Sequence, residues 1–134
     1  MADIVIDTNI VIWYFSGPRI RSASAQSAIT GAQRSGNFIF VPSINIVELV
    51  YLIERKRFDA NVLIKLREAL DDDSTAFKLV ELNRQIADEL ENVDRSIVAD
   101  MPDRIVAATA LHLGMPLVTS DGNLHRLSNV QTIW

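Results

Sequence analysis

Three carboxylates stand where the surrounding pattern favours apolar side chains. Asp7 directly follows three β-branched residues, Asp121 lies two residues beyond a short apolar run, and Glu48 lies on the apolar stripe of a predicted helix. A charge on a buried face costs free energy unless it is paired or bound to a metal. Clustered carboxylates raise one another's pKa, and Mg²⁺ or Mn²⁺ neutralises them by binding their oxygens. Such ions could activate water for phosphodiester cleavage, so the three acids predict metal-dependent phosphoryl chemistry.

A fourth acid comes from the start of a helix predicted over residues 102–113, where Asp100 and Asp103 lie three residues apart. An N-cap needs only one carboxylate, and Asp100 is placed to supply it. Asp103 is then free to lean toward the same edge as the other acids. Asp100 could share or replace the role of Asp103, and the sequence leaves both alternatives open.

Each acid also has a structural explanation when it is taken alone. Asp7 could cap the following helix, Asp121 could form part of a plain turn, and Glu48 could lie at the border of its helix face. Taken together, two strand ends and one helix face converge on one edge of the predicted sheet. This convergence favours a shared function over coincidence.

The elements that must position these acids alternate along the chain. Strands are predicted at 4–6, 38–41, 77–82, 117–119 and 130–133, and helices at 9–15, 22–35, 43–57, 59–70, 85–93 and 102–113. Short strands that alternate with helices predict a parallel sheet covered on both faces. Ligands of such sheets bind beyond the carboxyl ends of the strands, where Asp7 and Asp121 are expected.

Composition narrows the class of protein. The chain has 134 residues, 17 acidic and 13 basic side chains and no cysteine, which excludes a thiolate nucleophile, a zinc finger and an iron–sulfur site. It shows neither a secretory signal nor an apolar run of membrane-spanning length, so a cytoplasmic location is expected. Residues 19–67 carry eight Lys and Arg against three acids, which makes them the first place to expect phosphate contacts.

The motifs around the four acids resemble those of the PIN-domain family, specifically its VapC-type ribonuclease toxins of toxin–antitoxin pairs. The similar segments occur in family order: Ile-Val-Ile-Asp-Thr-Asn at 4–9, Ile-Val-Glu-Leu at 46–49, Asp-Arg-Ile-Val-Ala-Ala-Thr-Ala at 103–110 and Leu-Val-Thr-Ser-Asp at 117–121. The resemblance covers nearly the whole chain, which is expected to form a single PIN-like nuclease domain over residues 1–134.

The resemblance implies a three-layer α/β/α fold with a mostly parallel central sheet of four to five strands. It further implies a Mg²⁺- or Mn²⁺-dependent endoribonuclease that forms a homodimer and is inhibited by an antitoxin peptide near the acids. The implied metal ligands are Asp7, Glu48, Asp103 and Asp121. The residues expected to orient them by hydrogen bonds are Thr8, Asn9, Thr119 and Ser120, with Asp100 beside Asp103.

Other functions fit the sequence less well. A receiver-type phosphoacceptor domain needs paired acids after its first strand and a late lysine, whereas here Asp7 stands alone and Lys78 is the final lysine. Nucleotide-binding and serine-hydrolase motifs are absent from the sequence. A non-catalytic domain that binds RNA or a partner protein remains an alternative.

Two further groups of residues allow different interpretations. The two histidines, His112 and His125, are better explained as solvated or hydrogen-bonded side chains than as catalytic ones, because the metal mechanism needs no imidazole. The helix segment 45–55 carries more apolar side chains than one buried stripe requires, which marks it as a candidate dimer face. The apolar residues in question are Ile46, Leu49, Val50 and Ile53.

Overall fold

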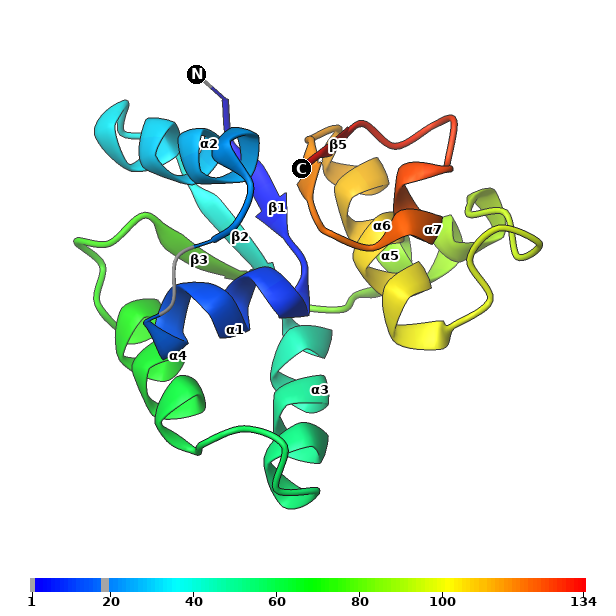
Figure 1. Ribbon diagram of the computed structural model, residues 1–134. Coiled ribbons are helices and arrows are strands. Elements are labelled where there is room, and N and C mark those ends of the chain that lie inside the picture. Colours follow the sequence, from blue (N-terminus) through cyan, green and yellow to red (C-terminus); the bar gives the residue numbers. More distant parts are fainter. Residues whose placement is uncertain (1, 18–19) are drawn as a thin grey trace.

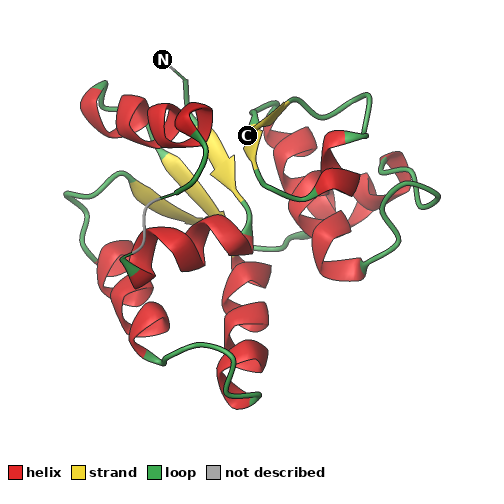
Figure 2. Cartoon of the chain, viewed as in Figure 1, coloured by secondary structure: helices red, strands yellow, loops and turns green. Residues whose placement is uncertain are grey.

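The computed structural model describes residues 2–17 and 20–134. Within them, five parallel strands form one sheet, in which the first strand is central (Figures 1 and 2). The order across the sheet is β3 (Phe77–Val80), β2 (Ile39–Pro42), β1 (Ile4–Ile6), β4 (Leu117–Val118) and β5 (Thr132–Ile133). The prediction of a parallel sheet of four to five strands is confirmed.

Helices cover both faces of this sheet, so that the chain forms three layers. Figure 1 shows the first four helices on one side and the last three on the other. The first group is α1 (Thr8–Ser16), α2 (Ala23–Arg34), α3 (Ser43–Glu54) and α4 (Asn61–Asp71). The second is α5 (Arg84–Glu89) with the 3₁₀ turn η1 (Leu90–Asn92), α6 (Met101–Leu113) and α7 (Gly122–His125). None of the described helices combines the length and apolar character needed to cross a membrane.

The alternation of side chains along β1 separates two hydrophobic cores. Ile4 and Ile6 pack on the side of α1, α2 and α4, whereas Val5 packs on the side of α5, α6 and α7. Successive side chains of a strand point to opposite faces, so this strand of three buried residues serves both cores. Helix α3 joins them, because its Leu49 lies in the first core and its Ile44 in the second. Helix α3 therefore lies where one of its side chains can reach the edge of the sheet.

The central strands β1 and β4 end beside each other. The backbone N–H of Asp7 donates to the carbonyl oxygen of Val118 at 3.1 Å, and the N–H of Thr119 donates to that of Ile133 at 3.1 Å. The carboxyl ends of parallel strands meet at one edge, so Asp7 and Thr119 leave the sheet together. This edge is the place where the sequence predicted a ligand site.

Local details add to or differ from the sequence prediction. Ser43 is the first residue of α3, and its Oγ accepts a hydrogen bond from the N–H of Leu82 at 3.1 Å. The hydroxyl is drawn away from its own helix because the chain after β3 passes beside the end of β2. The helix predicted over 85–93 is divided into α5 and η1, and α7 was not predicted because its four residues show no apolar period.

Candidate active site

Asp7 lies at the bottom of the site and is almost fully buried, with 3% of its surface exposed. It caps α1, because its Oδ1 accepts from the N–H of Thr8 at 2.8 Å, while its Oδ2 accepts from Oγ1 of Thr119 at 2.7 Å. Burial raises the pKa of Asp7, and the two hydrogen bonds oppose that rise. The capping role and the site role are therefore compatible, since each uses a different oxygen.

Glu48 reaches the same place from α3. Its Oε1 accepts a hydrogen bond of 2.6 Å from Oγ1 of Thr8, the residue next to Asp7. Partial burial raises the pKa of Glu48, the Thr8 hydroxyl lowers it, and the charges of Asp7 and Asp100 raise it further. Helix α3 thus places the carboxylate of Glu48 at the sheet edge where β1 ends.

Asn45 also belongs to this group and is not among the residues predicted from the sequence. The side chain is completely buried, its Nδ2 donates to the carbonyl oxygen of Ile6 at 2.9 Å, and its Oδ1 accepts from Oγ1 of Thr8 at 3.0 Å. Asn45 therefore fastens α3 to the last residue of β1. The available signal was its spacing, three residues before Glu48 on the same helix face.

Asp103 has a strongly raised pKa. Burial, followed by the charges of Asp7, Asp100, Asp121 and Glu48, raises its pKa to about 8. Four carboxylates from separate parts of the chain therefore lie within electrostatic reach of Asp103. This is the convergence that the sequence predicted for the four acids, with Asp100 as a fifth member.

The structure assigns Asp100 a capping position without removing it from the site. Its Oδ2 accepts from the N–H of Asp103 at 3.3 Å, so it is the N-cap of α6. Its charge nevertheless contributes to the raised pKa of Asp7, Glu48 and Asp103. The predicted cap is confirmed, and a role shared by Asp100 and Asp103 stays a prediction.

Asp121 combines a cap with a link to the strand end. Its Oδ1 accepts from the N–H groups of Asn123 and Leu124 at 2.8 and 3.1 Å, which makes it the N-cap of α7. Its own N–H donates to Oγ1 of Thr119 at 3.0 Å. The turn after β4 is thereby bound to the hydroxyl that holds Asp7.

Two of the expected supporting residues do not make the hydrogen bonds predicted for them. Thr8 and Thr119 hold the carboxylates of Asp7 and Glu48 as described above. The side chain of Asn9 is exposed on α1, Ser120 is partly exposed, and in the described chain neither side chain donates to one of the acids. Asn45 instead occupies the buried position beside Ile6 and Thr8. The reason is that α3 approaches the buried face of β1, whereas Asn9 points outward from the first turn of α1.

The donor set fits a hard cation. Every contributing group is a carboxylate, and no lysine or arginine of the described residues is among the charges that shift the pKa of Asp7, Glu48 or Asp103. In the same described residues, no three acidic or histidine side chains lie close enough together to hold an ion as they stand. An ion would therefore draw together carboxylates that now repel one another, and it would supply the positive charge that the described side chains do not bring.

A groove beside the site runs between α3 and the start of α6. The described residues along it include Glu48 and Asp100 near the carboxylate cluster and Arg55, which follows the last residue of α3 about two turns beyond Glu48. Large exposed apolar side chains flank it, namely Val47, Tyr51 and Met101. The groove is thus acidic at the site, apolar in its middle and basic at the far end.

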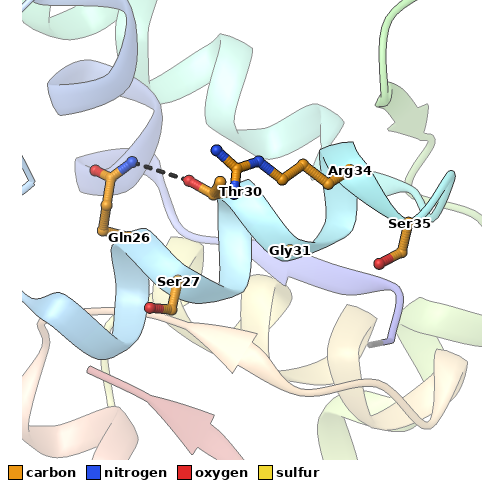
Figure 3. Close-up of a pocket in the computed structure, with 6 residues that line it drawn as sticks. All are labelled: Gln26, Ser27, Thr30, Gly31, Arg34 and Ser35. Carbon is orange, nitrogen blue, oxygen red and sulfur yellow. Dashed lines mark hydrogen bonds between the residues drawn. The ribbon is translucent and has the colours of Figure 1, made fainter.

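A second hollow lies on α2, away from the ends of β1 and β4. Figure 3 shows its lining, which includes Arg34 and a hydrogen bond of 3.2 Å from the side-chain amide of Gln26 to the hydroxyl of Thr30. The described residues that line it contribute no carboxylate. It therefore offers none of the chemistry of the acidic site.

Comparison with known proteins gives a consistent result. The family model described as PIN domain matches residues 4–130. Ribonuclease VapC22 of Mycobacterium tuberculosis (strain ATCC 25618 / H37Rv) is 27% identical over 136 residues, which cover 100% of both chains.

Three solved structures are similar to the chain over nearly its whole length. The structure of VapBC2 from Rickettsia felis bound to a promoter DNA fragment has a TM-score of 0.72 at 16% identity and covers 97% of this chain and 96% of the other. A toxin–antitoxin complex from Klebsiella pneumoniae gives 0.66 at 22% identity, with 95% and 94% covered. FitAcB from Neisseria gonorrhoeae gives 0.63 at 17% identity, with 96% and 95% covered. At these identities the structures show a shared fold.

Proposed function

The chain belongs to the PIN domain family, and from that premise we propose that it is a metal-dependent endoribonuclease, the toxin of a toxin–antitoxin pair. The observation that carries the proposal is the cluster of Asp7, Glu48, Asp103 and Asp121, in which burial and mutual repulsion raise the pKa of Asp103 to about 8. Similarity to a ribonuclease over the whole chain supports RNA as the substrate.

In this proposal the four carboxylates would hold Mg²⁺ or Mn²⁺. The ion, when bound, lowers the pKa of water and stabilises the charge that develops on the phosphodiester. The chain's own hydroxyls prepare the ligands: Oγ1 of Thr119 donates to Asp7, and Oγ1 of Thr8 donates to Glu48. A hydrogen bond to the charged form favours ionisation, so both donors keep buried carboxylates available as oxygen ligands.

The same charge distribution supports the proposal of an antitoxin partner. The carboxylate cluster, whose pKa shifts owe nothing to a lysine or arginine of the described residues, would attract a cationic side chain of an inhibitory peptide. The similarity in fold to VapBC2 from Rickettsia felis and to a toxin–antitoxin complex from Klebsiella pneumoniae supports this part of the proposal. We place the protein in the cytoplasm, where such a partner and RNA are both present.

A homodimer is proposed through the groove face, which consists of the exposed side chains of Val47, Tyr51 and Met101. This face replaces the residues predicted for the dimer from the sequence. Leu49 is completely buried, and Ile46, Val50 and Ile53 are partly buried against the first core. They face inward because α3 contacts α1, α4 and α6 rather than the sheet alone. The side chains of α3 that remain exposed are Val47 and Tyr51, which lie beside Met101 of α6 along the groove.

The test of catalysis is cleavage of an RNA panel with Mg²⁺, Mn²⁺ or EDTA. Wild type is compared with Asp7→Asn and with Asp73→Asn, a matched change at an exposed aspartate outside the site. Cleavage that requires the metal, fails with Asp7→Asn and persists with Asp73→Asn supports the proposal. Cleavage in EDTA, or full activity of Asp7→Asn, contradicts the mechanism.

The same experiment separates the binding-only alternative. A non-catalytic domain predicts no cleavage with any metal and an RNA affinity that Asp7→Asn does not change. The toxin role is tested separately by expressing the chain without its partner, which is expected to arrest growth. Harmless accumulation of active enzyme would contradict the toxin role alone.

A further inference from the structure

One histidine joins the end of β4 to the edge strand of the sheet. His125, the last residue of α7, is partly buried, and its Nε2 lies 2.7 Å from the carbonyl oxygen of Thr119. Its Nδ1 lies 2.6 Å from Oγ1 of Thr132 in β5. The imidazole therefore spans from the residue after β4 to the outermost strand.

The partners of the ring determine which nitrogen carries the proton. The carbonyl oxygen of Thr119 can only accept a hydrogen bond, so Nε2 of His125 must be the donor. In the neutral ring Nδ1 is then an acceptor, and the hydroxyl of Thr132 donates to it. The structure thus assigns one tautomer, with the proton on Nε2, and Thr132 stabilises it.

Thr119 is the residue through which this contact reaches the acids. It is completely buried, and its N–H donates to the carbonyl oxygen of Ile133 at 3.1 Å. Its Oγ1 donates to Asp7 at 2.7 Å and accepts from the N–H of Asp121 at 3.0 Å. The remaining polar group of Thr119 is its carbonyl oxygen, which accepts from His125.

We propose that His125 is a positioning residue for the acidic site, acting through Thr119. The proposal rests on the proposed function, because it concerns the placement of the acids that would hold the ion. Strand β4 ends at Val118, so the sheet no longer restrains the chain beyond Thr119. His125 restrains this segment instead. Its hydrogen bond to Thr119 keeps the Thr119 hydroxyl in contact with Asp7 and the backbone N–H of Asp121 in contact with the same hydroxyl.

The first experiment needs no change at His125. Nitrogen NMR of the neutral imidazoles in the metal-free protein reports which ring nitrogen carries the proton. The chain has two histidines, so His112→Ala, a change at the exposed histidine of α6, assigns the remaining signal to His125. A proton fixed on Nε2 supports the proposal, and a proton on Nδ1 or an exchanging mixture overturns it.

The second experiment measures Mn²⁺ affinity and RNA cleavage of folded variants. Loss of a residue that orients metal ligands typically lowers affinity or activity about 10–100-fold, and we expect His125→Ala to fall in that range. His125→Gln restores an N–H donor near the position of Nε2 and is expected to recover most of the affinity. Thr132→Val keeps the ring but removes the hydroxyl, so a loss smaller than that of His125→Ala is expected, and His112→Ala should match wild type.

The outcomes distinguish this role from the proposed function. Wild type that binds no Mn²⁺ would overturn the proposed function and, with it, the role of His125. Mn²⁺ binding that survives His125→Ala unchanged would overturn the role of His125 alone. Equal losses in His125→Gln and His125→Ala, at equal thermal stability, would assign the residue to packing and overturn it as well.

Discussion

The hydroxyl of Thr8 lies 2.6 Å from Oε1 of Glu48 and 3.0 Å from Oδ1 of Asn45. A hydroxyl has one proton, so these two acceptors on α3 compete for a single donor. Thr8 follows Asp7 directly, and its backbone N–H holds that carboxylate at 2.8 Å. Thr8 therefore fixes the spacing between Asp7, which follows β1, and Glu48 of α3.

Thr8→Val should reduce cleavage in a chain that still folds. The valine keeps the shape of the side chain but cannot donate to Glu48, so the carboxylate loses its orientation. We expect a loss of about 10–100-fold in activity. Thr8→Ser, which keeps a hydroxyl, is the control and should retain most of the activity. Rates of RNA cleavage decide the matter, and a valine variant as active as wild type would contradict this role of Thr8.

Asn45→Ala should destabilise the fold itself. It removes the side chain that satisfies the carbonyl oxygen of Ile6, and an unsatisfied buried polar group costs about 1–3 kcal/mol. Asn61→Ala, at an exposed position of α4, is the matched control and should be nearly neutral. The free energy of unfolding in urea measures both. An unchanged midpoint for Asn45→Ala would show that water replaces the amide.

The sequence was sufficient for the sheet and for the neighbourhood of the acids, for identifiable physical reasons. The runs at 4–6 and 117–119 read as strands because they are short, apolar and β-branched, and a carboxylate just beyond them is conspicuous. The links between the acids are not conspicuous. Asn45 and His125 act through partners 37 and 6 residues away, at Thr8 and Thr119, and such partners are set by tertiary packing rather than by local pattern.

The outward faces of helices were also poorly predicted. The apolar period of α3 identified its core stripe but could not show that α1, α4 and α6 enclose most of the helix. The residues expected on a dimer face, Ile46 and Leu49 among them, are therefore turned inward. Exposure depends on which elements pack around a helix, and the sequence of the helix alone does not contain that information.

Tyr51→Asp should dissociate the proposed dimer. A charge placed on a 59% exposed aromatic position at the centre of the groove face opposes burial in an interface. Ile64→Asp, at a 49% exposed apolar position of α4 outside that face, is the matched control. Mass measured in solution should fall to that of the monomer for Tyr51→Asp only. A dimer that persists in this variant, or a monomeric wild type, would contradict the proposed face.

The stability of the metal-free protein should decrease as pH rises toward 8. The pKa of Asp103 is raised to about 8 in the folded chain, against about 3.9 for an ordinary aspartate. Between these values the folded state binds more protons than the unfolded state, so the free energy of unfolding falls with increasing pH. Asp103→Asn removes this titration and should flatten the pH dependence in the same window. Urea unfolding in EDTA at several pH values tests it, and an unchanged slope in the variant would contradict the assignment.

Asp100→Asn should separate the capping role of Asp100 from its contribution of charge. Asparagine caps a helix about as well as aspartate, so α6 should remain intact, whereas Asp100→Ala should cost about 1 kcal/mol of stability. Asp100 is exposed and already uses one oxygen for the N–H of Asp103, whereas burial and the charges of the four neighbouring carboxylates raise the pKa of Asp103. We therefore expect cleavage to fall by no more than about 10-fold in Asp100→Asn, as for a residue outside the ligand set, and to be lost in Asp103→Asn. If Asp100→Asn abolishes cleavage while Asp103→Asn retains it, the assignment of the third ligand must move from Asp103 to Asp100.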